Sequence, residues 1–141
     1  MLVLGRFTPE RKKILDTIKE ELRKNNYLPI LFDFDKPTSR DTHETVTTLA
    51  RLSKFIIADI TDPKSIPQEL VSIVHEIPSL PVQPVIEHGS EPWGMYDHIK
   101  QYKTVLDVFY YKDKAHLVES LKDKVFAKAE SKLLEFKMNY K

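Results

Sequence analysis

The sequence has no cysteine, only three glycines and almost no excess of charge of either sign. Without cysteine there is no disulfide framework, no thiolate ligand for zinc and no cysteine nucleophile. The three glycines, Gly5, Gly89 and Gly94, are too scattered to form a phosphate-cradling loop or a dinucleotide fingerprint, so any bound nucleotide is not held in the Rossmann manner. A formal net charge of +1 disfavours a dedicated nucleic-acid binder, which usually carries a basic stripe.

Long apolar runs are absent as well. No stretch approaches the roughly 20 apolar residues that cross a bilayer, and the start of the chain is too short for a signal peptide. We therefore expect a soluble, cytoplasmic protein without a membrane partner. Hydrophobic residues make up 41% and charged residues 30% of the 141 positions, an ordinary balance for one globular domain.

Apolar patterns typical of strands and helices alternate along the chain. Strands are expected over residues 2–4, 28–32, 55–60, 82–86 and 105–110. Helices are expected from Pro9 to the Asn25-Asn26 pair, over 41–52, 65–74 and 95–102, and from Asp113 onward. This alternation predicts right-handed βαβ units and a parallel sheet. The predicted fold class is a flavodoxin-like three-layer α/β fold with a five-stranded parallel sheet of order 2-1-3-4-5.

Two further expectations concern organisation. Because the first strand starts at Leu2, we expect residues 1–141 to be a single domain cut from a longer protein; the alternative is a short native chain with a truncated first strand. The charged segment 128–141 is expected to form a helical C-terminal extension. Pro84, inside the fourth strand, predicts reduced pairing at that point.

Ligands of an open parallel sheet bind beyond the carboxyl ends of its strands. The segments there are 5–7, 33–37, 61–69, 87–93 and the residues after Tyr110. Glu69 is the strongest candidate, because it lies in the first turn of the third predicted helix, where the helix dipole favours an ionised carboxylate. Such a carboxylate stabilises or traps the oxocarbenium ion formed when a base leaves C1 of ribose. The alternative is that Glu69 is a surface residue that only complements the dipole.

Other residues at this edge are candidates for binding. Arg6 follows the first strand and is suited to hold a pyrophosphate, or else it is solvated. Phe7, Phe34 and Trp93 are candidates to stack on an adenine or nicotinamide ring, or else they pack within the fold. Ser65 is expected to cap the third helix first and to contact a ligand second.

Asp59, the basic run 11–13 and the histidines are expected to have structural roles. Asp59, near the end of the third strand, is expected either to be buried and paired, orienting Arg6 or Lys64, or to bond neighbouring backbone; the sequence leaves this open. The run 11–13 predicts a solvated helix face. The five histidines show no metal-binding spacing, so no metal site is predicted.

A family resemblance rests on the strand from Phe55 to Ile60, the polar loop after it, and a helix that opens with Ser65 and contains Glu69-Leu70. Over about residues 2–110 the chain resembles a bacterial Toll/interleukin-1 receptor (TIR) domain and, more loosely, the nucleoside 2-deoxyribosyltransferases. In enzymatic members of both groups, a glutamate followed by leucine early in this helix is catalytic, which implies that role for Glu69. The resemblance also implies that residues 5–7 line the pocket.

The resemblance implies an enzyme that cleaves NAD at the nicotinamide–ribose bond in bacterial immune defence or signalling. NAD is then a substrate, and no separate cofactor is expected. Activity would depend on self-assembly through the loop Asp33–Arg40, with an attached domain of the longer chain as partner. Two alternatives stay open: a non-catalytic TIR-like module that self-associates through the same loop, and a nucleoside ribosyl-transferase or nucleotide sensor.

Overall fold

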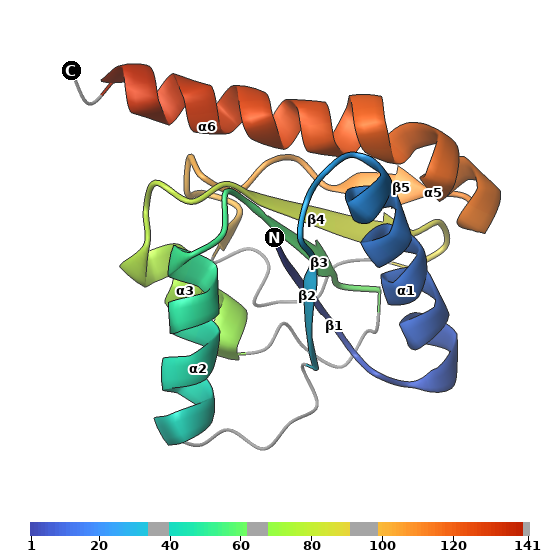
Figure 1. Ribbon diagram of the computed structural model, residues 1–141, viewed down its shortest axis with the longest axis horizontal. Coiled ribbons are helices and arrows are strands. Elements are labelled where there is room, and N and C mark those ends of the chain that lie inside the picture. Colours follow the sequence, from blue (N-terminus) through green and yellow to red (C-terminus); the bar gives the residue numbers. More distant parts are fainter. Residues whose placement is uncertain (34–39, 62–67, 91–98, 140–141) are drawn as a thin grey trace.

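The structure, a computed structural model, describes residues 1–33, 40–61, 68–90 and 99–139; within them, the side chains of 40–42, 68–69 and 139 are not described. Five parallel strands form one sheet in the order β2-β1-β3-β4-β5 (Figure 1), which confirms the predicted topology. The strands are β1 (Leu2–Gly5), β2 (Ile30–Asp33), β3 (Ile56–Asp59), β4 (Val82–Glu87) and β5 (Phe109–Tyr111).

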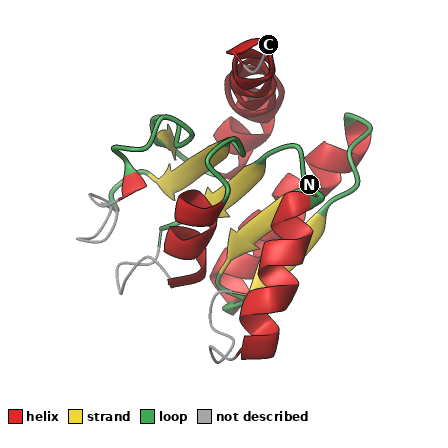
Figure 2. Cartoon of the chain, turned by 90° about the vertical axis from the view of Figure 1, so that its left-hand side faces the viewer, coloured by secondary structure: helices red, strands yellow, loops and turns green. Residues whose placement is uncertain are grey.

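Helices cover both faces of the sheet (Figure 2), so the fold has three layers. On one face, α1 (Pro9–Lys24) packs with the continuous helical segment α5 (Lys114–Ser120), η1 (Leu121–Phe126) and α6 (Ala127–Asn139). On the other face, α2 (Arg40–Arg51) and α3 (Gln68–Glu76) bury their apolar residues against the sheet. Strands that are covered on both sides are predominantly apolar, and every residue of β1 and β3 is buried.

Local chemistry sets the ends of α1 as the sequence predicts. The hydroxyl of Thr8 accepts a hydrogen bond from the backbone nitrogen of Arg11, and Pro9 occupies the first turn, where its missing N–H costs nothing. At the other end Asn26 has a φ of 67°, a left-handed conformation that asparagine tolerates and that terminates the helix. Asp113 caps α5 in the same way as Thr8 caps α1.

The fifth strand is shorter than predicted. Residues 105–110 read as one strand, but regular pairing begins only at Phe109, and Val105 makes an isolated bridge to Val82. Between these points the segment from Val105 to Phe109 is one residue longer than its partner from Val82 to Val85. The reduced pairing expected at Pro84 is found on the β5 side only: Pro84 stays in register with Ala58 of β3, but proline has no N–H to donate to β5.

Two predicted helices have different bounds. The helix expected over 95–102 does not reach Tyr102, because the chain turns from Lys100 onward; residues 91–98 lie outside the described part. The helix expected from Ser65 is described only from Gln68 and continues to Glu76. The helical extension after residue 128 is present as α6, and its Ala129 is fully buried in the core. None of the helices in the described ranges is long and apolar enough to cross a membrane.

Candidate functional site

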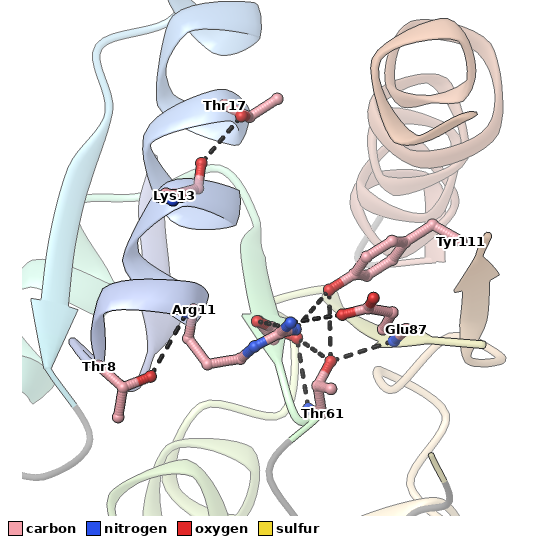
Figure 3. Close-up of polar contacts among 8 residues, drawn as sticks. Thr8, Arg11, Lys13, Thr17, Thr61, Glu87 and Tyr111 are labelled. Carbon is pink, nitrogen blue, oxygen red and sulfur yellow. Dashed lines mark hydrogen bonds and ion pairs between the residues drawn. The ribbon is translucent and has the colours of Figure 1, made fainter. Parts of the chain in front are cut away.

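Polar side chains from α1 and from the ends of β3, β4 and β5 meet at one point (Figure 3). They are Arg11, Asp59, Thr61, Glu87 and Tyr111, and we name them the Arg11 cluster. Strand alternation directs the side chains of Ile57, Asp59 and Thr61 to the same face of the sheet. Ile57 belongs to the core on the α1 side, so the cluster lies under the first turn of α1.

Arg11 is the central residue of the cluster. Its Nη1 atom donates to the hydroxyl of Tyr111 at 2.9 Å and lies 3.6 Å from Oδ2 of Asp59, while Nη2 donates to Oε2 of Glu87. The Arg11 side chain is only 15% exposed. Burial acts to lower the pKa of Arg11, but the hydrogen bond to Glu87 and the surrounding negative groups outweigh it, and the pKa is raised. The guanidinium therefore stays charged between two carboxyl groups.

Asp59 is the buried carboxyl group of the cluster. Its Oδ1 atom accepts from the backbone nitrogen of Thr61 at 3.3 Å and from the Thr61 hydroxyl. Its Oδ2 atom is buried and has no hydrogen-bond partner within the described residues, although the Arg11 guanidinium is near. Burial raises the pKa of Asp59, and the Thr61 bond and the Arg11 charge oppose that rise.

The hydroxyl groups of Thr61 and Tyr111 link the ends of β3, β4 and β5 through hydrogen bonds whose donors and acceptors are fixed. Thr61 has a single hydroxyl proton, which it donates to Asp59, and its oxygen accepts from the backbone nitrogen of Glu87 at 3.1 Å. The Tyr111 hydroxyl lies 3.3 Å from the same oxygen. Since the Thr61 proton is already used, Tyr111 is the donor in this pair, and it accepts in turn from Arg11. Burial raises the pKa of Tyr111, so the phenol keeps the proton that this chain requires.

Glu87 is the carboxyl group of the cluster that reaches solvent. It is the last residue of β4, and its side chain is 37% exposed. Oε2 is held by Arg11, whereas Oε1 makes no hydrogen bond or ion pair with any part of the chain that the structure describes. When both carboxyl groups are ionised, one guanidinium faces two carboxylates, and the cluster carries a net charge of −1.

The residues predicted for the site lie elsewhere along the same edge or beyond the described residues. Arg6, half-buried, directly follows β1. Phe7 is 37% exposed; its backbone nitrogen donates to Oδ1 of Asp33 at 3.2 Å. Nζ of Lys12 lies 5.3 Å from the centre of the Phe7 ring. Glu69 is the second residue of α3, as its sequence position predicts, but its side chain is outside the description. Phe34, Ser65 and Trp93 also lie outside the described residues.

One prediction about the cluster is wrong. Arg11 was expected on a solvated helix face with its neighbours, yet it turns inward, because Asp59 and Glu87 supply negative charge beneath the first turn of α1. Lys13, two positions on, is exposed as expected. Both alternatives left open for Asp59 hold: it is buried and paired, with Arg11 as its partner among the described residues, and it also accepts from the neighbouring backbone nitrogen of Thr61. The carboxyl-edge rule did select the segments that contain Thr61, Glu87 and Tyr111.

Comparison with known proteins identifies a shared fold and no family. No family model and no curated protein matches the chain. A CMP N-glycosidase from Clostridium botulinum is similar in structure, with a TM-score of 0.61, 10% identity, and coverage of 85% of this chain and 95% of its own. A response regulator receiver domain from Clostridium thermocellum has a TM-score of 0.56, 17% identity, and coverage of 90% and 94%.

A flavodoxin-like domain from Synechococcus is also similar, with a TM-score of 0.53, 9% identity, and coverage of 99% of this chain and 98% of its own. Identities this low carry information about the fold and not about the reaction. The chain thus has the flavodoxin-like α/β fold that was expected from its sequence, and the narrower TIR resemblance stays a prediction.

Proposed function

We propose that the chain hydrolyses the bond between the base and C1 of ribose in a nucleotide. The observation that carries this proposal is the position of Glu87 at the carboxyl edge of the sheet: Arg11 holds its Oε2 atom, and its Oε1 atom makes no hydrogen bond or ion pair within the described residues. Breaking a ribosyl bond builds positive charge on the sugar, and a fixed anion at that point stabilises it. The similar fold of a CMP N-glycosidase supports the idea that this scaffold suits such chemistry.

NAD is the substrate we favour within this class. Its nicotinamide leaves as a neutral molecule with the bonding electrons, so no strong acid has to protonate it. Water then adds to C1 and releases one proton. Cytosine, by contrast, leaves CMP only with an added proton. The TIR resemblance points to the same substrate.

The proposed roles follow from position at the sheet edge. Glu69, in the first turn of α3, would stabilise or trap the ribosyl cation. Arg6, just after β1, would hold the pyrophosphate, and Phe7, Phe34 or Trp93 would stack on a ring. Ser65 would contact the ligand near Glu69. We further propose, from the resemblance alone, that activity belongs to bacterial immune defence or signalling and requires self-assembly.

The test measures release of the base by chromatography. Concentrated protein is incubated with NAD and, separately, with CMP. Glu69→Gln is compared with Glu76→Gln, which makes the same change at the other end of α3. We expect nicotinamide release by the wild type and by Glu76→Gln, and at least about a 100-fold loss in Glu69→Gln. No base release from either nucleotide at any protein concentration would reject the proposed function.

A non-catalytic signalling module is the second candidate, favoured by the similarity to a response regulator receiver domain. In that case the protein should self-associate without consuming NAD, and charge-reversing changes in the loop Asp33–Arg40 should abolish association. Sedimentation velocity of the wild type and a Lys36→Glu variant measures this directly. Base exchange between nucleosides without loss of NAD would instead identify the ribosyl-transferase alternative.

A further inference from the structure

The two carboxyl groups of the Arg11 cluster differ in what they are able to touch. The side chain of Asp59 is fully buried behind the guanidinium, so no ligand reaches it. Glu87 binds the same guanidinium from the solvent side, and its side chain is partly exposed. Within the cluster, Glu87 is therefore the carboxylate that meets a molecule bound at the edge of the sheet.

Glu87 is also held in place more firmly than an ordinary surface glutamate. Its backbone nitrogen donates to Thr61, and its backbone oxygen accepts from Ser90 at 3.1 Å. Arg11 fixes Oε2 and is itself fixed by Asp59 and Tyr111. Oε1 makes no contact of this kind with the described residues, so one oxygen is anchored and the other is free. A carboxylate oriented before the substrate arrives needs little reorganisation when charge develops beside it.

Asp59 holds the Arg11 guanidinium from its buried side, while Glu87 binds it from the side that is open to solvent. When Asp59 is ionised, the cluster carries one negative charge in excess, and Glu87 is the carboxylate of the cluster that solvent reaches. Arg11 and Asp59 are thus positioning residues, while Glu87 is the group that faces the ligand.

We infer that Glu87 is a catalytic carboxylate whose free Oε1 atom faces C1 of the ribose and stabilises the ribosyl cation, and that Arg11, held by Asp59 and Tyr111, positions it. This inference rests on the proposed cleavage of a ribosyl bond. It adds a second anion to Glu69: β4 carries Glu87 on the α1 side of the sheet, whereas Glu69 comes from α3, which covers the other face. A pyridinium nucleotide fits such an anion, because its base leaves as a neutral molecule and needs no added proton.

Two readouts test the role of Glu87, one with turnover and one without. The first is kcat for nicotinamide release from NAD. The second is binding, by calorimetry, of a protonated iminoribitol 5′-phosphate, which mimics the ribosyl cation, compared with the uncharged anhydroribitol 5′-phosphate. The variants are Glu87→Gln, which keeps size but removes charge, and Glu87→Asp, which keeps charge but withdraws the oxygen. Glu119→Gln, an exposed glutamate on α5, is the matched control.

We expect Glu87→Gln to lower kcat about 100-fold and to weaken the cationic mimic at least about tenfold while leaving the neutral mimic unchanged. Glu87→Asp should retain binding of the cation but lose most of kcat, because the charge remains and the position does not. Thermal unfolding of each variant shows whether it is folded. If Glu87→Gln does not fold, the decision rests on Glu87→Asp, and kcat within threefold of wild type in that variant overturns the inference.

The outcomes separate this inference from the proposed function. If kcat of Glu87→Gln stays within threefold of wild type and its binding of the cationic mimic does not change, the role of Glu87 is overturned. The proposal of an N-glycosidase then still stands. If the cationic mimic binds in a way that depends on Glu87 but the wild type releases no base, the anionic binding site is supported and the proposed reaction is rejected. Absence of both rejects both.

Discussion

The guanidinium of Arg11 donates to the phenol of Tyr111 over 2.9 Å, although the two residues are 100 positions apart in the sequence. This bond joins the first turn of α1 to the end of β5 and holds the cation over Asp59. The helix pattern predicts that Arg11 faces solvent, but its side chain instead contacts residues at the carboxyl ends of β3, β4 and β5. The stability of that arrangement depends on keeping a charge beside a carboxyl group that is itself fully buried.

The first prediction concerns removal of the cation. Arg11→Met leaves the Asp59 carboxyl group buried with Thr61 as its partner, and we expect a loss of about 3 kcal/mol in the free energy of unfolding. Adding Asp59→Asn to Arg11→Met should recover part of that loss, because no charge is then left uncompensated. Urea unfolding of the wild type, both single variants and the double variant measures the coupling. Lys13→Met, an exposed change on the same helix, should cost less than about 0.5 kcal/mol. Strictly additive costs would show that Arg11 and Asp59 do not stabilise one another.

The second prediction concerns pH. Burial raises the pKa of Asp59 above its ordinary value of 3.8. The folded state then holds the Asp59 proton more tightly than the unfolded state does. Its contribution to stability is therefore fully present below about pH 3.8 and is lost as pH rises through the folded pKa. The stability of the wild type relative to Asp59→Asn should accordingly fall as pH rises above about 3.8 in urea titrations. A difference that grows with pH would mean that the attraction of Arg11 outweighs burial.

Local sequence patterns specify the elements of this fold better than they specify the contacts between distant polar side chains. Apolar runs locate β1 and β3, because strands covered on both faces show little alternation between polar and apolar residues. The rule for carboxyl edges selects the segments that contain Thr61, Glu87 and Tyr111, because it needs only the order of elements. Arg11 escapes both signals. Its partners Glu87 and Tyr111 lie 76 and 100 positions away, and helix periodicity does not say which of three adjacent cations turns toward them.

The predicted fifth strand is too long at its start for a physical reason. Residues 105–110 are apolar enough to read as a strand, but the extra residue opposite Pro84 and the bond from Gln83 to Asp107 interrupt its pairing. That interruption is a long-range effect of one proline on a neighbouring segment. The composition of residues 105–110 alone therefore does not predict this interruption of the pairing.

The third prediction concerns the contact between α6 and Tyr27, which lies in the connection from α1 to β2. The Tyr27 hydroxyl donates to Oε1 of Glu130 at 2.7 Å, and its ring packs edge-on against Phe55 and Phe126. Burial, followed by the Glu130 bond, raises the pKa of Tyr27 from 10.0 to about 12. The proton is held more tightly in the folded state, so this contribution to stability is present below pH 10 and is lost as pH rises toward 12.

Tyr27→Phe keeps the ring and removes the hydroxyl. At pH near 8 it should lower the free energy of unfolding by about 1 kcal/mol, and the gap from wild type should narrow between about pH 10 and 12. Tyr110→Phe makes the same change at an exposed tyrosine and should have little effect at any of these values. Urea unfolding across this range measures both. A gap that stays constant with pH would show that the Glu130 bond does not hold the Tyr27 proton.

The fourth prediction concerns the break in the ladder beside Pro84. Gln83 is buried, and its Nε2 atom donates to the carbonyl oxygens of Asp107 and Pro84, each at 2.8 Å. The side chain thereby replaces a ladder bond that the interrupted pairing cannot supply. Gln83→Leu has a similar volume but leaves the Asp107 carbonyl without this donor, so we expect a loss of about 2 kcal/mol in the free energy of unfolding.

Gln83→Glu should cost more than Gln83→Leu, because it places a buried negative charge against the same two carbonyl oxygens. Urea unfolding ranks the two variants, and hydrogen exchange at the Leu106 amide, which donates to Val82, reports whether the strands separate locally. A surface hollow lined in part by Gln83, Asp107 and Lys128 lies beside this point. If water from that hollow satisfied the Asp107 carbonyl, Gln83→Leu would remain within about 0.5 kcal/mol of wild type, and the side-chain bond would be dispensable.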